Sequence, residues 1–218
     1  MINRRLFPAA VFLCLAISVG LFQAFAALPT EDGSPVGTVV RIQGSAVAMQ
    51  DALPRTLKAG DKVLLGDVLS TGKNARLEMR MIDDAVITLG ERTVFVVVDY
   101  VVENVNPNVG MRLLQGAFSA VSGKVVETAS SRFTVSTEVA TIGIRGTTFW
   151  GGMLDGEKFE VALLDGKGVY VETKAGRVEL TDVGQGTAIT TADQPPSEPK
   201  IWGAQKTARA VATVSFSK

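Results

Sequence analysis

Residues 159–173 read FEVALLDGKGVYVET. In 159–164 and again in 169–173, a large apolar residue recurs at every second position. This period of two is typical of β-strands, in which successive side chains point to opposite faces. Asp165-Gly166 separates the two runs, and both residue types tolerate the positive φ that a tight turn needs. The stretch therefore predicts two β-strands joined as a hairpin.

The same pattern continues through most of the chain. Residues 75–82 (ARLEMRMI) alternate apolar and charged side chains, which indicates a half-buried strand. Residues 94–102 (VFVVVDYVV) are apolar at nearly every position, and this predicts a strand buried on both faces. Glycines interrupt these runs at turn-like intervals, and no helical period is found between Val36 and Ile189. We expect one all-β domain, folded as a twisted two-layer sheet or a short solenoid-like β-roll.

The composition excludes several kinds of site. Lys and Arg together number 22, Asp and Glu together also number 22, and there is no histidine. A formal charge of zero without a basic patch argues against a nucleic acid partner. Without histidine, the chain cannot form a Ser-His-Asp triad, a Cys-His pair or a histidine metal site. Cys14 is the single cysteine and cannot make a disulfide or a thiolate site by itself. We therefore expect no metal, no cofactor and no enzymatic activity.

The N-terminus has the features of a secretion signal. Residues 3–5 give a short basic start, residues 6–26 carry no charge, and Ala24-Phe25-Ala26 offers the small residues that signal peptidase recognises. We expect residues 1–26 to be a signal peptide cleaved before Ala27, and the mature protein to be periplasmic or otherwise exported. The alternative is an uncleaved membrane anchor, because the apolar segment is about long enough to span a bilayer. Membrane contact would then be confined to this segment.

Three further regions follow the signal segment. Residues 27–35 form a polar lead-in, and residues 36–190 carry the β pattern. Residues 191–218 begin with a proline-containing linker and end in a tail with few apolar residues. This tail is too poor in apolar residues for a core of its own, so we expect it to lie against the β domain or to remain mobile.

Residues 140–152 read ATIGIRGTTFWGG and contain the main candidate site. Arg145 lies between Gly143 and Gly146, so its guanidinium can approach the backbone closely and offer a fork of donors. Its partner is either an acid on a neighbouring strand, which makes it structural, or an anionic ligand. No other basic residue lies within eleven positions of Arg145, so we favour the structural interpretation. Thr147 completes this candidate motif.

Trp150 is the aromatic candidate of the same stretch. It stands beside Gly151-Gly152, where an indole could stack on a sugar ring. A tryptophan that is buried, or that lies at the rim of a strand end, is the commoner arrangement. Both interpretations of Trp150 remain open at this stage.

Three motifs of the chain occur in a characteristic order. They are GTVVRIQGSA at 37–46, GDVLSTG at 66–72 and IRGT at 144–147. With these motifs, the segment from about Val36 to Thr190 resembles the FecR domain family. The chain departs from the family pattern at two places. The family usually has an Asp-Gly turn where this chain has Asp83-Asp84, and it often has a proline after the threonine that matches Thr137, where this chain has Glu138.

The resemblance implies a regulatory role. FecR-like regulators join a cytoplasmic anti-sigma region and a membrane helix to a periplasmic FecR domain, which receives a signal from a TonB-dependent receptor. Only five residues precede the apolar segment in this chain, so we expect a free-standing, exported FecR-domain protein that lacks the anti-sigma region. We expect a non-enzymatic periplasmic module that binds a protein partner at the envelope or senses an envelope signal. The alternative is an envelope carbohydrate-binding domain that uses Trp150, Trp202 and Tyr170 as stacking rings.

Overall fold

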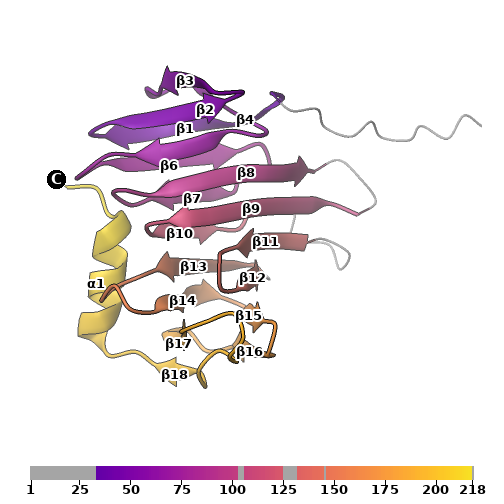
Figure 1. The fold of residues 1–218 in the computed structure, drawn as a ribbon, viewed down its shortest axis with the longest axis vertical. Coiled ribbons are helices and arrows are strands. Elements are labelled where there is room, and N and C mark those ends of the chain that lie inside the picture. The colour runs from indigo at the N-terminus through magenta and orange to yellow at the C-terminus, as the bar shows by residue number, and fades with distance from the viewer. Residues whose placement is uncertain (1–32, 103–105, 125–131, 145, 218) are drawn as a thin grey trace, which may run out of the picture.

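Two open β-sheets face each other across one apolar core in the computed structural model (Figure 1). The structure describes residues 33–102, 106–124, 132–144 and 146–217. Each sheet has nine strands, and one short helix lies along the side of the stack. The prediction of an all-β, two-layer domain is confirmed.

Sheet A holds nine strands in the spatial order β18 (Lys200–Ile201), β17 (Gln185–Ile189), β14 (Phe159–Gly166), β13 (Thr147–Gly152), β10 (Phe118–Val121), β7 (Val86–Leu89), β6 (Arg76–Met81), β1 (Pro35–Gln43) and β4 (Lys62–Leu64). Sheet B is built in the same way from β16 (Gly176–Leu180), β15 (Val169–Thr173), β12 (Thr141–Ile144), β11 (Arg132–Ser136), β9 (Asn108–Gln115), β8 (Val94–Val101), β5 (Val68–Thr71), β2 (Ala46–Gln50) and β3 (Leu53–Thr56).

The chain crosses from one sheet to the other after every one or two strands. Neighbouring strands run antiparallel, with the exception of β9 and β11, which are parallel. Both sheets therefore grow together from the N-terminal to the C-terminal end of the stack (Figure 1). This order gives the molecule its solenoid-like character.

The core between the sheets follows from the period of two. In β6, Leu77, Met79 and Met81 point inward and are buried, while the residues between them face outward. The centre of the core is aromatic, because the Phe118 ring lies 5.5 Å from that of Phe95 and 5.3 Å from that of Phe149. Tilted and edge-on ring contacts of this kind add to the stability gained from apolar burial.

The predicted hairpin at Asp165-Gly166 is wrong in its topology. A turn does occur there, with Gly166 at a φ of 103°. However, β14 belongs to sheet A and β15 to sheet B, so the turn carries the chain from one layer to the other. An apolar residue at every second position, followed by a turn signal, predicts two strands and a bend. It does not predict whether the two strands pair with each other.

The expectation that residues 94–102 are buried on both faces is also wrong. Phe95, Val97 and Tyr100 of β8 point into the core and are at most 1% exposed. On the other face, Val94 and Val96 are half-buried and Val98 is 49% exposed. The outer face of β8 is therefore apolar without being covered by any segment that the structure describes.

The C-terminal tail docks on the β domain, in line with the first of the two expectations for it. It contributes β18 to the edge of sheet A and then forms α1 (Ala204–Val214). Arg76 on β6 donates to the carbonyl of Ala212 at 3.3 Å, close to the C-terminal end of the helix, where a cation is favoured. Within the described part of the chain, no helix has the length and apolar character needed to cross a membrane.

Candidate functional site

The predicted site residues do not gather on one surface. Arg145 lies outside the described residues, so its structural role stays a prediction. Gly143 belongs to β12 of sheet B, whereas Thr147 and Trp150 belong to β13 of sheet A. The stretch 140–152 therefore connects one sheet to the other. Those of its residues that the structure describes make separate contacts.

Gly143 provides room for an aromatic ring on the outer face of sheet B. A Cβ atom at this position would lie 2.0 Å from Cε1 and Cζ of Tyr170, which is opposite Gly143 on β15. The guanidinium of Arg177 lies 3.8 Å from the centre of the same ring. Tyr170 is thus held between a glycine backbone and a cation, as aromatic residues commonly are beside glycines in sheets.

Thr147, which follows Gly146, connects the two sheets through hydrogen bonds. Gly146 has a φ of 63°, a conformation that favours glycine. The buried hydroxyl of Thr147 donates to the carbonyl of Gly168 at 2.8 Å and accepts from the Gly168 amide at 3.1 Å. The Thr147 amide in turn donates to the Ser122 hydroxyl at 2.8 Å. Because Gly168 immediately precedes β15, this pair of hydrogen bonds ties β13 of sheet A to sheet B.

Trp150 is a structural residue on the outer side of sheet A. It is fully buried, and its Nε1 donates to the hydroxyl of Thr213 in α1 at 2.9 Å. Its neighbour Phe149 points the other way, into the core between the sheets. Trp150 packs with Ala210 and Val214 of α1, so a sugar cannot reach its ring while the helix is docked.

The three proposed stacking rings do not form a shared surface. Trp202 contacts Trp150 edge-on at 6.1 Å and lies over the backbone of Gly186. Tyr170 is on the other sheet and has both faces occupied. This geometry removes the sequence basis of the carbohydrate-binding alternative.

The acidic residues that could suggest catalysis serve turns and buried contacts. The carboxylates of Asp61 and Asp67 accept from backbone amides three residues earlier, at 2.9 and 2.8 Å, as aspartates in turns usually do. Asp84 takes the left-handed conformation (φ 68°) where the FecR pattern has glycine, and Lys124 pairs with it at 2.5 Å. This hydrogen-bonded ammonium holds the pKa of the Asp84 carboxyl below its ordinary value. Among the described residues, no three potential ligand side chains come together in a way that could hold a metal ion.

Asp83 and Tyr100 form a buried polar pair. The Tyr100 hydroxyl donates to the Asp83 carboxylate, which also accepts from the Ala85 amide at 3.2 Å. Burial raises the pKa of the Tyr100 phenol well above its ordinary value of 10, and the charge of Asp83 adds to the shift. Asp83 of this pair belongs to the Asp83-Asp84 turn, where this chain departs from the Asp-Gly pattern.

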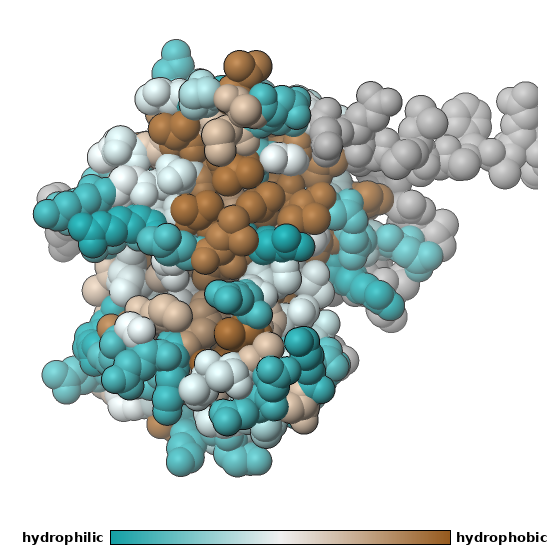
Figure 2. Space-filling model, viewed as in Figure 1, coloured by the Kyte–Doolittle hydropathy of each residue, from teal (hydrophilic) through white to brown (hydrophobic). Residues whose placement is uncertain are grey.

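The outer face of sheet B carries an apolar surface that no described segment covers, and we call it the valine patch. Its exposed members are Met49, Val98 and Leu114, with 44%, 49% and 57% of their surface accessible. Half-buried valines on the same face complete the patch: Val47, Val68, Val94 and Val96. Figure 2 shows the corresponding hydrophobic area between polar regions of the surface.

Strand register makes the patch continuous. Met49 of β2 is opposite Val68 of β5, which is opposite Val96 of β8, and Val96 is opposite Arg112 of β9. Side chains directly opposite on neighbouring strands are in contact range. One apolar row thus crosses three strands and ends at an exposed guanidinium. Sequence reasoning missed this surface, because the apolar outer residues of β8 were attributed to burial on both faces.

Part of the chain matches a known protein family. The family model described as FecR protein matches residues 67–167, a little under half of the chain. The resemblance inferred from the motifs is therefore confirmed for this segment, which includes β5, β8 and β9 of the valine patch. The FecR family is regulatory rather than enzymatic, so the match over residues 67–167 suggests a signalling or regulatory module.

One solved structure is similar to this chain in fold, and a second structure carries the same description. Both are of a protein from Parabacteroides distasonis ATCC 8503 that is described as a "putative anti-sigma factor". The first is 18% identical to this chain with a TM-score of 0.51, and the second is 19% identical with a TM-score of 0.49. Each match covers 64% of this chain and 61% of the solved chain, so it extends over less than two thirds of that protein. Among curated proteins, none matches this chain.

The strand edges that the structure describes are protected against pairing. The two edges of sheet B are β3, which contains Pro54, and β16, where Arg177 and Glu179 pair at 2.8 Å. The two edges of sheet A are short, because β4 has three residues and β18 has two. Proline, charge and short length each discourage addition of a further strand. Among the surfaces that the structure describes, the valine patch is therefore the best suited for contact with another molecule.

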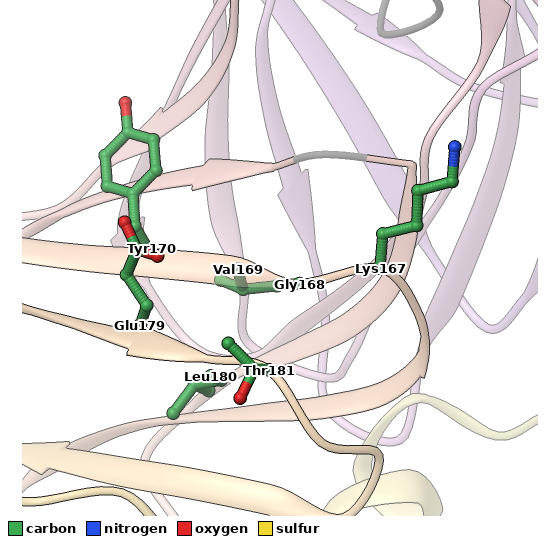
Figure 3. A pocket seen from close by; sticks show the side chains of 7 residues that line it. All are labelled: Lys167, Gly168, Val169, Tyr170, Glu179, Leu180 and Thr181. Atoms are coloured by element: carbon green, nitrogen blue, oxygen red, sulfur yellow. The ribbon is translucent and has the colours of Figure 1, made fainter.

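A small pocket lies at the other end of sheet B, between β15 and β16. Its volume is about 160 Å³, which is below the range of ordinary small-molecule sites. Lys167 and Tyr170 extend from opposite ends of it and do not converge on a common point (Figure 3). This pocket lacks the converging polar groups that a specific ligand needs.

Proposed function

We propose that this FecR-domain protein is a non-enzymatic signalling module that binds a protein partner at the cell envelope. The observation that carries the proposal is the valine patch, an apolar surface on sheet B that no described segment covers. Contiguous apolar surface of this kind with a polar surround marks interaction sites on soluble proteins. A signalling role is supported by the regulatory nature of the FecR family and by the similarity in fold to a protein described as a "putative anti-sigma factor".

Two comparisons within the molecule favour a protein ligand over a sugar. The aromatic rings that could stack on a sugar are buried or occupied, as described for Trp150 and Tyr170. The valine patch offers aliphatic side chains and few polar groups. Desolvation of aliphatic side chains favours association with another apolar protein surface.

Photo-crosslinking in the producing cell tests this proposal. A photo-reactive amino acid is placed at Val98 in the patch, or at Val183, an equally exposed valine in the turn after β16, as a matched control. A discrete crosslinked protein is expected from position 98 and not from position 183. The same crosslinking pattern at both positions, or none at position 98, would show that the patch has no protein partner in the envelope.

The location of the protein is a separate part of the proposal. The basic start, the apolar segment and the Ala24-Phe25-Ala26 sequence support export through a cleaved signal peptide. The N-terminal sequence of the secreted or periplasmic protein is expected to begin at Ala27. Its intact mass is expected to be that of a chain that starts at Ala27. Recovery of a chain that still begins at Met1 in the membrane fraction would instead show that the segment is an anchor.

A further inference from the structure

We propose that the valine patch binds an amphipathic α-helix of the partner, and that an acidic residue beside the apolar stripe of this helix pairs with Arg112. This inference rests on the proposed function, because it specifies the partner of the same surface. It combines the shape of the patch, the packing of α1 on the opposite sheet, and the position of Arg112.

The molecule already shows how a helix covers an outer sheet face. On sheet A, Ala210 and Val214 of α1 pack on Trp150 and Ala162, and Lys206 pairs with Glu160 at 2.5 Å beside this apolar contact. Sheet B has an apolar outer surface but no described helix on it (Figure 1). Because the described strand edges are protected, a helix on the face fits better than a strand added at an edge.

The dimensions of the patch also fit a helix. Its side chains come from β2, β5, β8 and β9, which are consecutive neighbours in sheet B. With neighbouring strands about 4.8 Å apart, these four strands span roughly 14 Å. A helix rises about 1.5 Å per residue, so about three turns cover this width. The covering helix on sheet A, α1, has a similar length of 11 residues.

Arg112 defines the charge that the partner should carry. It is exposed at the end of the row formed by Met49, Val68 and Val96, and it makes no ion pair with any described residue. The nearby carboxylate of Asp99 accepts instead from the amide of Asn108. A guanidinium at the border of an apolar surface favours a carboxylate on the partner and gives the contact its orientation.

Two other occupants fit these features less well. A lipid surface is usually met by Trp or Tyr together with several basic residues, whereas the patch is aliphatic and has a single bordering arginine. A two-fold pairing of two copies would bring two Arg112 side chains into one interface, and the acid near each of them, Asp99, already accepts from Asn108. We therefore assign the surface to a helix of a different protein.

Binding of two designed peptides to the full exported protein tests this assignment. Both are helices of about 18 residues with the same leucine stripe, and one carries Glu where the other carries Lys beside the stripe. Fluorescence anisotropy is expected to show at least about tenfold tighter binding of the Glu peptide. Arg112→Glu should reverse this preference. Val98→Glu should weaken binding of the Glu peptide at least about tenfold, while Val183→Glu should leave it unchanged.

Each alternative outcome has a defined meaning. The proposal is overturned if neither peptide binds at millimolar concentration, or if Arg112→Glu leaves the preference as it was. It is also overturned if sedimentation shows a dimer that Val98→Glu dissociates, or if the protein binds anionic phospholipid vesicles through Val98. A crosslink from position 98 that persists despite failed peptide binding would reject the helix while leaving the proposed protein-binding function intact.

Discussion

At the scale of single residues, Thr147 is the side chain that connects the two layers. Its hydroxyl both donates to and accepts from Gly168, and all of these groups are buried. Thr147→Val keeps the shape of the side chain but leaves both Gly168 groups without this partner. We expect a loss of about 1–3 kcal/mol in the free energy of unfolding, measured with urea. Thr148→Val on the other face of β13 is the control and should change stability by less than about 0.5 kcal/mol.

The buried phenol of Tyr100 leads to a prediction about how the stability of the fold depends on pH. Its pKa is raised in the folded protein, so the folded state keeps the phenolic proton at pH values where the unfolded state loses it. The resulting stabilisation is complete below pH 10 and is lost as the pH rises beyond it. The expected decline is about 1.4 kcal/mol per pH unit above pH 10.

The measurement uses the fact that the chain has only two tyrosines. Urea unfolding between pH 9 and 11 should show this decline in the parent protein and a shallower one in Tyr100→Phe. Tyr170→Phe removes the other tyrosine, from the outer face of sheet B, and is the control that should keep the parent slope. Equal slopes for the parent and Tyr100→Phe would contradict the burial of an un-ionised Tyr100.

At the scale of elements, the sequence predicted strands better than it predicted their partners. The alternation in residues 75–82 specified β6 correctly, because a strand half-buried in a sandwich shows its two faces directly. Residues 94–102 have apolar side chains on both faces, and composition cannot distinguish a covered face from an exposed docking face. At Asp165-Gly166, the choice between hairpin and crossover depends on distant contacts, above all the hydrogen bonds between Thr147 and Gly168.

The candidate site shows the same limit. The sequence left open whether Trp150 is buried or stacks on a sugar, and the structure shows it buried. The valine patch could not be found from any single stretch of sequence, since it is assembled from four strands that are spread over residues 46–115. The strongest local signal was the excess of valine in β8, because an outward-facing apolar row requires either a cover or a partner.

At the scale of elements, the packing of α1 on sheet A leads to a prediction about what happens when this helix is detached. Ala210 is fully buried against the Trp150 cluster, whereas the next residue, Val211, is 38% exposed. Ala210→Asp buries an unpaired carboxylate, so it should detach the helix and lower the free energy of unfolding by about 2–4 kcal/mol. Acrylamide should then quench tryptophan fluorescence more strongly, since both tryptophans lie at this contact. Val211→Asp should change neither property appreciably, and if it matched Ala210→Asp the assigned helix face would be wrong.

At the scale of the whole molecule, the two sheets have different outer faces. Sheet A is partly covered by α1 and bears charged residues on β6, including Arg76 and Glu78. Sheet B joins an apolar half, the valine patch, which nothing in the described part of the chain covers, to a polar half on β11, β12, β15 and β16. The proposed interaction surface is thus separate from the residues that hold the layers together. Substitutions in the patch can therefore affect binding without affecting folding.

Val97 and Val98 test this separation, because they are adjacent on β8 and have opposite environments. Val97 is 1% exposed in the core, whereas Val98 is 49% exposed in the patch. Val→Thr keeps the side-chain shape and suits a strand, so the change isolates the effect of a hydroxyl. At Val97 it should lower the free energy of unfolding by about 1–3 kcal/mol, since the hydroxyl enters an apolar core. At Val98 the change should be below about 0.5 kcal/mol, while native-state binding of an apolar dye such as ANS should fall. Equal destabilisation by both variants would mean that the outer face of β8 is covered in solution, and the valine patch would then be part of the core rather than a surface for a partner.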